Sequence, residues 1–438
     1  MNQPSQTSSS KPAEPLKLAA SAINHLIRVL PGGTAHCIGV VLVVMMTGRL
    51  VQSKGSLARA VLPLVFTLKW GWHRVERAME RGQVDVDLLL ERAFDWCMSN
   101  LPVEPVELGV QQRTVLAIDS STIARWRAKP GMELLGKGFY HRAGKAIKAN
   151  IIAVATSVVF IAGVRVGLVR CIRFGSSCEA AVAAVFEALP ASEGARLLVV
   201  DAGIATHQQF AASSEHDALL GRLRINCKLR CAPPPRPEHP GPGRPLTHGP
   251  ILHPGWSTPE IEADEDLITM HAKGELRVRR WRHLHFEDYA DPLLDVVRID
   301  HPDYKTPLIV GSVARELTTS EIWQGYNHRS PVETNFYVAQ DSAAMEMPRA
   351  WTENAIKRRI GLAMLAGFIL KVIAAVCETL PIGPWDRNPQ PTAGRLAHYL
   401  DIRIHNFSDL ALSGVHPRNY RKIPDSTSFK DLPLPEAS

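Results

Sequence analysis

The chain has 438 residues, of which 45% are hydrophobic, so it can bury a sizeable core and form more than one domain. Its formal net charge of +7 favours a polyanionic partner, but the surplus is modest, so the positions of the basic residues matter more than their sum. The seven cysteines are scattered and odd in number. They argue against a disulfide-stapled secreted domain and favour a reduced, cytoplasmic protein.

The chain begins with a polar segment that is followed by helical patterns. Residues 1–16 are rich in Ser, Gln and Pro, a composition typical of a disordered tail. Residues 17–105 show helical hydrophobic periodicity, and we expect an N-terminal helical domain there. Basic residues lie beside Trp70 and Trp72 in this domain. They indicate either a DNA-contacting helix or an ordinary solvated basic face.

Residues 110–226 change to a mixed strand and helix pattern. Apolar runs predict strands at 113–119, 148–160, 165–174, 196–201 and 219–225, with helices at 177–190 and from Thr206. The order β-β-β-α-β-α-β is that of a ribonuclease-H-like mixed sheet, in which the fourth strand lies beside the first. The predicted fold class is therefore α/β.

Residues 227–318 interrupt this pattern and predict a β-rich insertion. Its first part, 231–250, is dense in Pro and Gly and is predicted to be a loop. Three apolar runs after the loop predict antiparallel strands, at 275–286, 293–300 and 306–314.

Helical periodicity resumes at 319–345 and 354–380, so residues 319–378 are expected to complete the domain begun at 110–226. Residues 379–438 are expected to be a tail with at most one helix. The apolar stretch 37–48 is too short to cross a bilayer, and 150–169 is interrupted by Gly and Arg and rich in β-branched residues. We therefore expect no membrane span.

Three carboxylates stand at positions suited to a metal site. Asp119 and Asp201 each end a predicted buried strand, and Glu333 lies in a helical pattern where Tyr326, Arg329 and Glu333 share one face. Each acid alone is explained by a turn cap or a solvated helix residue. Their conjunction with the strand order favours a divalent-metal site facing a phosphate backbone, because Mg²⁺ prefers oxygen ligands.

The segment YNHRSPVETNFYVAQ is similar to the Y-(2)-R-(3)-E-(6)-K signature of DDE transposases of the insertion-sequence-4 type. Tyr326, Arg329 and Glu333 match its first three positions, and Gln340 stands where the family has Lys. AIDSSTIAR and VVDAGIATHQQF resemble the segments that hold the two aspartates of that family. The resemblance spans about residues 110–375.

The resemblance implies that Asp119, Asp201 and Glu333 are catalytic and bind two Mg²⁺ ions, with Mn²⁺ as a substitute. The enzyme would cleave transposon ends and join their 3′-OH to target DNA, with double-stranded DNA as its partner and a homodimer in the synaptic complex. Tyr326, Arg329 and Gln340 would contact DNA. Two alternatives stay open: a ribonuclease-H-like nuclease that only hydrolyses, and a catalytically inactive DNA-binding protein, because Gln340 adds no charge.

The loop that follows Asp119 is basic and contains interleaved aromatic residues. This mixture suits a DNA backbone together with stacking on an unpaired base, although an ordinary basic surface loop would have the same composition. The basic residues expected to bind DNA there are Arg125, Arg127, Lys137, Arg142 and Lys145.

Overall fold

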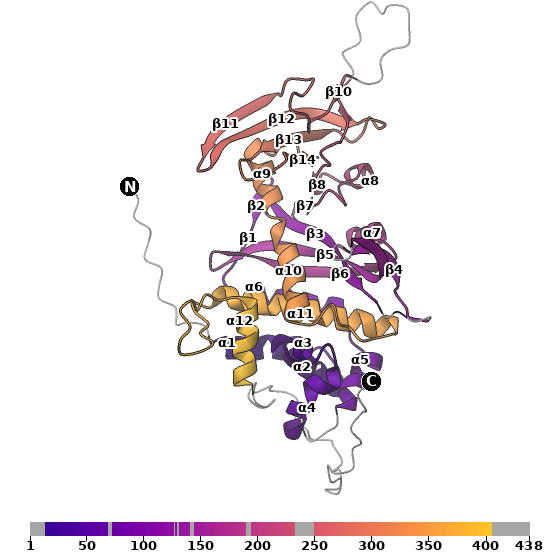
Figure 1. Ribbon diagram of the computed structural model, residues 1–438, viewed down its shortest axis with the longest axis vertical. Coiled ribbons are helices and arrows are strands. Elements are labelled where there is room, and N and C mark those ends of the chain that lie inside the picture. Colours follow the sequence, from indigo (N-terminus) through magenta and orange to yellow (C-terminus); the bar gives the residue numbers. More distant parts are fainter. Residues whose placement is uncertain are drawn as a thin grey trace, which may run out of the picture.

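The computed structural model describes residues 14–68, 72–126, 128, 131–140, 144–189, 194–232 and 249–404. Figure 1 shows an elongated molecule with helices at one end, a sheet in the middle and a β-rich region at the other end. The first 13 of the residues expected to form the N-terminal tail lie outside the described residues, as do 405–438. The N-terminal helices begin at Pro15, slightly earlier than expected.

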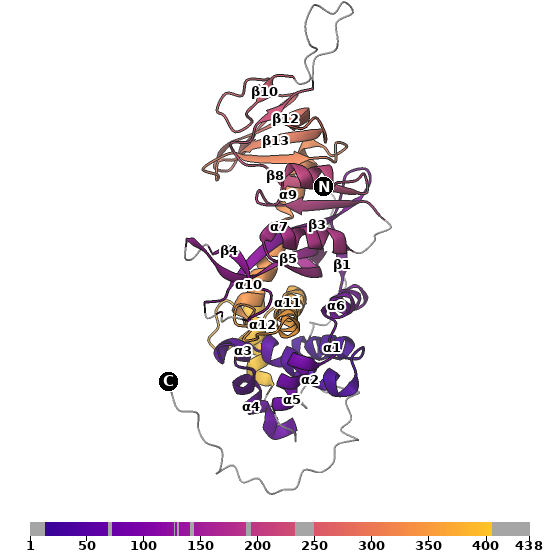
Figure 2. The same ribbon diagram turned by 90° about the vertical axis from the view of Figure 1, so that its right-hand side faces the viewer.

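The N-terminal helices and the two C-terminal helices together form the helical end of the molecule (Figures 1 and 2). They are α1 (Pro15–Ile27), α2 (Gly32–Met46), α3 (Arg49–Gln52), α4 (Leu57–Leu68), α5 (His73–Arg81), α6 (Val86–Asn100), α11 (Glu353–Val376) and α12 (Ala393–Arg403).

Two apolar helices form the core of this layer. Nearly all side chains of α2 from Cys37 to Met46 are buried. In the described part of the chain, α11 is the one helix long and apolar enough to cross a membrane, and 83% of its apolar window is buried inside the protein. It packs between the N-terminal helices and the sheet, which accounts for its apolar surface on all sides.

A mixed sheet runs through the rest of the molecule. Its strands are β1 (Val103–Pro105), β2 (Glu107–Leu108), β3 (Arg113–Ala124), β4 (Gly136–Tyr140), β5 (Lys145–Ile161), β6 (Val164–Gly175), β7 (Arg196–Val200), β8 (Asp217–Arg222), β9 (Leu229–Arg230), β10 (Ile251–Leu252), β11 (Glu265–His271), β12 (Gly274–Phe286), β13 (Leu294–Asp300) and β14 (Leu308–Ser312). The helices beside it are α7 (Cys178–Ala188), α8 (His207–Ala211), α9 (Thr319–Asn327) and α10 (Ser330–Asp341).

The order of the central strands is β6–β5–β3–β7–β8. As predicted, β5 and β6 form an antiparallel hairpin, and β7 lies beside β3 and parallel to it. The predicted antiparallel strands of the insertion are also present, as β12, β13 and β14. They are not a separate layer: β14 pairs with β8, so the insertion continues the same sheet. The sequence pattern did not predict β11, which pairs with β12.

The helical stretch predicted at 319–345 is two helices. Thr318 and Glu321 form a capping box that starts α9, and α10 begins after Arg329 with Pro331 in its first turn. In a continuous helix the ring of Pro331 would clash with the carbonyl group four residues earlier and would leave it without a donor. The predicted single helix is therefore wrong, and Tyr326, Arg329 and Glu333 lie around a break between two helices.

One fully buried ion pair lies inside the β-rich region. Arg280 on β12 donates to the carboxylate of Asp295 on β13 at 2.5 Å, and both side chains are only 2% exposed. Arg277 and Asp266 form a second pair on neighbouring strands, but these side chains are 41% and 37% exposed. The two pairs share the same chemistry and differ in burial.

This contrast gives the first prediction. Asp295→Ala removes the carboxylate in direct contact with the buried guanidinium and leaves it Glu265 at 4.0 Å, so the free energy of unfolding should fall by about 3–5 kcal/mol. Asp266→Ala should lower it by less than about 1 kcal/mol, because water solvates Arg277. Urea unfolding followed by circular dichroism measures both. Equal losses for the two variants would contradict the assignment of Arg280 and Asp295 as a buried pair.

Candidate active site

The strand pairing brings the two aspartates together. Ile118 on β3 pairs with Val200 on β7, and both side chains pack in the core cluster on the α7 side of the sheet. Side chains alternate between the faces of a strand, so the next residues, Asp119 and Asp201, are directed toward the opposite face. Helices α9 and α10 lie on that face (Figure 1).

The break between α9 and α10 supplies the remaining groups. The phenol of Tyr326, in the last turn of α9, donates to Asp201 at 3.1 Å. Arg329 occupies the N-cap of α10 and donates to Asp119 at 3.3 Å and to Glu333 at 2.5 Å. These bonds form two groups, and they adjoin where the Arg329 guanidinium lies 5.9 Å from the centre of the Tyr326 ring, so the structure brings all five predicted residues together.

The carboxylates of the cluster influence one another electrostatically. The Asp119 side chain is only 20% exposed, and burial raises its pKa to about 6. Burial is the largest cause of this net shift; a 2.8 Å hydrogen bond from the Ser120 amide and the charge of Arg329 act to lower the pKa, and the charges of Asp201 and Glu333 act to raise it. A buried carboxyl group with acidic neighbours is a group that a nearby cation would stabilise in its ionised form.

The other two groups of the cluster are donors. Burial and the Asp201 charge raise the pKa of Tyr326 to about 12, so its phenol stays protonated at neutral pH. The neighbouring Tyr326, Asp201, Glu333 and Asp119 raise the pKa of Arg329, although burial opposes them. Arg329 is therefore a permanent cation among three acids.

The donor chemistry of the site fits Mg²⁺, because Asp119, Asp201 and Glu333 offer only oxygen atoms. Within the described residues, however, no three acidic, histidine or cysteine side chains stand close enough to hold an ion together. Arg329 lies between Asp119 and Glu333 and bonds to both. A metal ion could be shared by these two carboxylates only if the guanidinium moved.

Arg222 is a further basic residue at the site that the sequence reasoning missed. It ends β8, next to β7, and its guanidinium lies 3.9 Å from the Asp201 carboxylate. The side chain is partly exposed, so it also faces solvent. The sequence around Arg222 did not indicate that this residue lies near Asp201, because the two are brought together by the pairing of β8 with β7.

The other predicted DNA-binding residues fall into four groups. Lys137 and Lys145 are exposed on the β4–β5 hairpin, and Lys137 pairs across the strands with the exposed Lys148. Arg125 donates to the backbone oxygen of Ala350 at 2.6 Å and so also has a structural role. Gln340 is half-buried in the last turn of α10. The remaining two, Arg127 and Arg142, lie outside the described residues.

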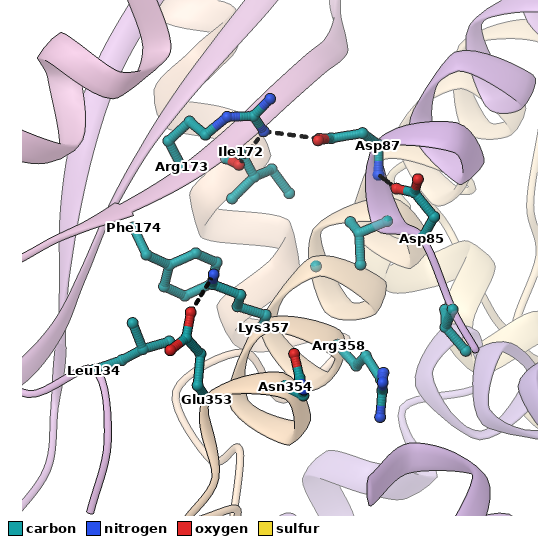
Figure 3. Close-up of a pocket in the computed structure, with 13 residues that line it drawn as sticks. Asp85, Asp87, Leu134, Ile172, Arg173, Phe174, Glu353, Asn354, Lys357 and Arg358 are labelled. Atoms are coloured by element: carbon teal, nitrogen blue, oxygen red, sulfur yellow. Dashed lines mark hydrogen bonds and ion pairs between the residues drawn. The ribbon is translucent and has the colours of Figure 1, made fainter. Parts of the chain in front are cut away.

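A cavity of about 660 Å³ lies away from this cluster, where the starts of α6 and α11 meet the end of β6 (Figure 3). Arg173 in its wall pairs with Asp87 at 2.8 Å, and Lys357 pairs with Glu353. The acids and bases of this cavity largely satisfy one another. Its acids and bases are equal in number, whereas the carboxylate cluster sets three acids against Arg329 and Arg222.

No protein-family model matches this chain, and no curated protein matches it at a significant level. The resemblance to insertion-sequence-4 transposases rests on three short segments and on the spacing of a few residues within them. Function is therefore inferred from the chemistry of the site.

The raised pKa of Asp119 predicts a pH effect on the metal-free protein. Between about pH 4 and pH 6 the folded state binds a proton at Asp119 that the unfolded state has released, so this residue makes stability fall as pH rises. The full fall is on the order of 3 kcal/mol for a shift from 3.8 to about 6. Asp119→Asn removes this titration. Urea unfolding in EDTA measures the free energy of unfolding of both proteins. The difference between wild type and Asp119→Asn should change between about pH 4 and pH 6. A constant difference across this range would contradict the prediction.

Proposed function

We propose that this protein is a transposase, a DNA phosphoryl-transfer enzyme whose catalytic residues are Asp119, Asp201 and Glu333. The observation that carries the proposal is the convergence of these acids, from β3, β7 and α10, on Arg329 and Tyr326. The strand order β6–β5–β3–β7–β8, with β7 and β8 parallel to β3, supports a ribonuclease-H-like catalytic fold. We also infer a cytoplasmic protein that acts as a homodimer when it brings two DNA ends together.

The three carboxylates would hold Mg²⁺, or Mn²⁺ in its place. Two such ions, when bound, activate an oxygen nucleophile and stabilise the leaving oxygen of a phosphodiester. Because water and a DNA 3′-OH are equivalent nucleophiles to such a site, one set of residues can serve both strand cleavage and strand joining.

The neighbouring side chains would bind the phosphate. Arg329 can donate two parallel hydrogen bonds to phosphate oxygens once it leaves the carboxylates, and the planar fork of Arg suits this task better than Lys. Tyr326 stays protonated and donates a further hydrogen bond. Arg222 adds a cation on the Asp201 side of the site. Each of these three donors contacts at least one of the carboxylates.

Two other functions compete with this proposal. A nuclease that only hydrolyses would use the same acids. A catalytically inactive DNA-binding protein is favoured by Gln340, which replaces a cation, and by the guanidinium that stands between Asp119 and Glu333. The first differs from a transposase in its products, and the second in its lack of metal-dependent cleavage.

The decisive measurement is cleavage of the DNA ends that flank this protein's own coding sequence, with Mg²⁺ or Mn²⁺. Asp119→Ala, Asp201→Ala and Glu333→Ala should each lower the rate by more than about 100-fold, since even outer-shell partners of metal ligands are worth 10–100-fold. Asp266→Ala, an exposed acid in the β-rich region, is the matched control and should cleave normally.

A second substrate, an end already cleaved to a free 3′-OH, separates the competing functions. Joined product indicates a transposase, and cleavage without joining indicates a nuclease. DNA binding without cleavage by the wild type would contradict the proposed activity and support the inactive protein.

Gln340→Lys tests the departure from the family signature. The substitution adds one cation near the end of α10, so log K for binding to transposon-end DNA should fall more steeply with log salt concentration, by about 0.9 in slope. Fluorescence anisotropy between about 50 and 200 mM salt measures this. An unchanged slope would show that position 340 does not contact phosphate, and Gln340→Glu should change the slope in the opposite direction if it does.

A further inference from the structure

A second cavity, of about 500 Å³, lies at the far end of the strand that carries Asp119. The turn after β3 contributes Arg125 and Trp126 to its wall, the connection between α10 and α11 contributes Arg349 and Trp351, and the turn after α3 contributes Lys54. Three segments that are distant in the sequence therefore meet here.

These segments are fixed to one another by backbone contacts. Arg125 donates to the Ala350 oxygen at 2.6 Å, and the amide of Glu133 donates to the Trp351 oxygen at 3.2 Å. A side chain at Gly55 would collide with the backbone of Met347. Arg349 has a φ of 34°, a conformation that a non-glycine residue keeps only where its surroundings enforce it. The cavity is thus part of the packed structure.

The chemistry of the wall is aromatic and cationic. Trp126 is 60% exposed although Tyr140 holds it edge to face at 5.6 Å, and Trp351 is 48% exposed. Large aromatic side chains that remain exposed in a concave site commonly contact a ligand.

The charges of the wall are unbalanced. Its cations are Lys54, Arg125 and Arg349, against one acid, Glu346. Burial is the main cause that lowers the pKa of Arg125, and the nearby charge of Arg359 lowers it further. In the neighbouring cavity of Figure 3, by contrast, cations and acids pair with one another. The wall therefore suits a flat ligand that carries negative charge.

We propose that this cavity, hereafter the Trp126–Trp351 pocket, binds an unpaired nucleobase of the DNA strand a few nucleotides from the cleavage site, together with its phosphate. The proposal rests on the proposed function. Aromatic rings stack on any base, and basic side chains beside them bind the backbone, which is how proteins hold single strands. The pocket is too small for a duplex but has room for one nucleotide.

The distance from the carboxylates agrees with this occupant. Ala124 lies in the pocket wall five residues beyond Asp119 on the same strand, which is about 17 Å at 3.3 Å per residue. That separation corresponds to a few nucleotides of DNA. A DNA strand that runs from the carboxylates alongside β3 would thus place an unpaired base at Trp126, a few nucleotides from the cleaved bond.

Fluorescence anisotropy with the full-length protein tests the proposal. The probes are a labelled duplex with a three-nucleotide single-stranded overhang and the same duplex with blunt ends. Wild type should bind the overhang more tightly, and Trp126→Ala and Trp351→Ala should each weaken this binding by about tenfold or more. Blunt-duplex binding should change by less than about twofold. Arg349→Gln should weaken overhang binding and lower its salt dependence.

Matched variants separate stacking from folding. Trp126→Phe keeps a ring and should restore most of the affinity for the overhang. Trp385→Ala removes an exposed tryptophan elsewhere, 91% exposed, and should have no effect. A 2-aminopurine placed in the overhang should be quenched by wild type and not by Trp126→Ala, which reports stacking directly.

The outcomes distinguish the two proposals. Equal affinities of wild type and both tryptophan variants for the overhang, with normal duplex binding and cleavage, would overturn the pocket and leave the proposed function standing. Failure of the wild type to bind any DNA would overturn both. Loss of overhang binding in Trp126→Ala with recovery in Trp126→Phe supports the pocket.

Discussion

Arg329 donates hydrogen bonds to Asp119 and Glu333 from the break between α9 and α10, and its charge also stabilises Asp201. The charges of Asp201 and Glu333 raise the pKa of Asp119, so these acids repel the Asp119 carboxylate, and the guanidinium of Arg329 offsets part of that repulsion. A divalent ion would provide more charge in the same place. The proposed chemistry then follows from one exchange, in which metal replaces Arg329 among the acids and Arg329 becomes available to phosphate.

How well the site could be predicted depended on the range of the interactions that build it. Alternation of side chains along β3 and β7 is a local property, so Asp119 and Asp201 could be assigned from sequence once the strands were recognised. The spacing of Tyr326, Arg329 and Glu333 was also readable, although Pro331 divides the helix that the spacing suggested. The pairing of strands that are distant in the sequence could not be predicted from it. The continuation of the sheet through β14 and the position of Arg222 beside Asp201 depend on strand neighbours that no periodicity reveals.

The position of Glu333 depends on helix α11. Lys371 on α11 donates to Thr334 at 2.5 Å and to Asn335 at 2.8 Å, and Asn335 in turn donates to the Gly167 oxygen on β6 at 3.2 Å. Burial lowers the pKa of Lys371 to about 7, which shows that keeping its charge inside the protein costs free energy. Part of the stabilisation from its hydrogen bonds offsets this cost. Because α11 also packs on the N-terminal helices, that domain supports α10 and the carboxylate it carries. The helical end of the molecule is therefore mechanically connected to the site.

The proposed DNA binding depends on the cations around the site, because position 340 carries Gln where the resembled transposases have Lys. Salt-dependent DNA binding sums the contributions of many phosphate contacts, so one lost charge removes one contribution among several. Lys137 lies directly opposite Lys148 on the β4–β5 hairpin, an arrangement of like charges that costs stability unless an anion lies between them. Arg349 and Lys54 add cations at the end of β3. If the protein binds DNA as proposed, these cations would retain most of its electrostatic affinity without a cation on α10.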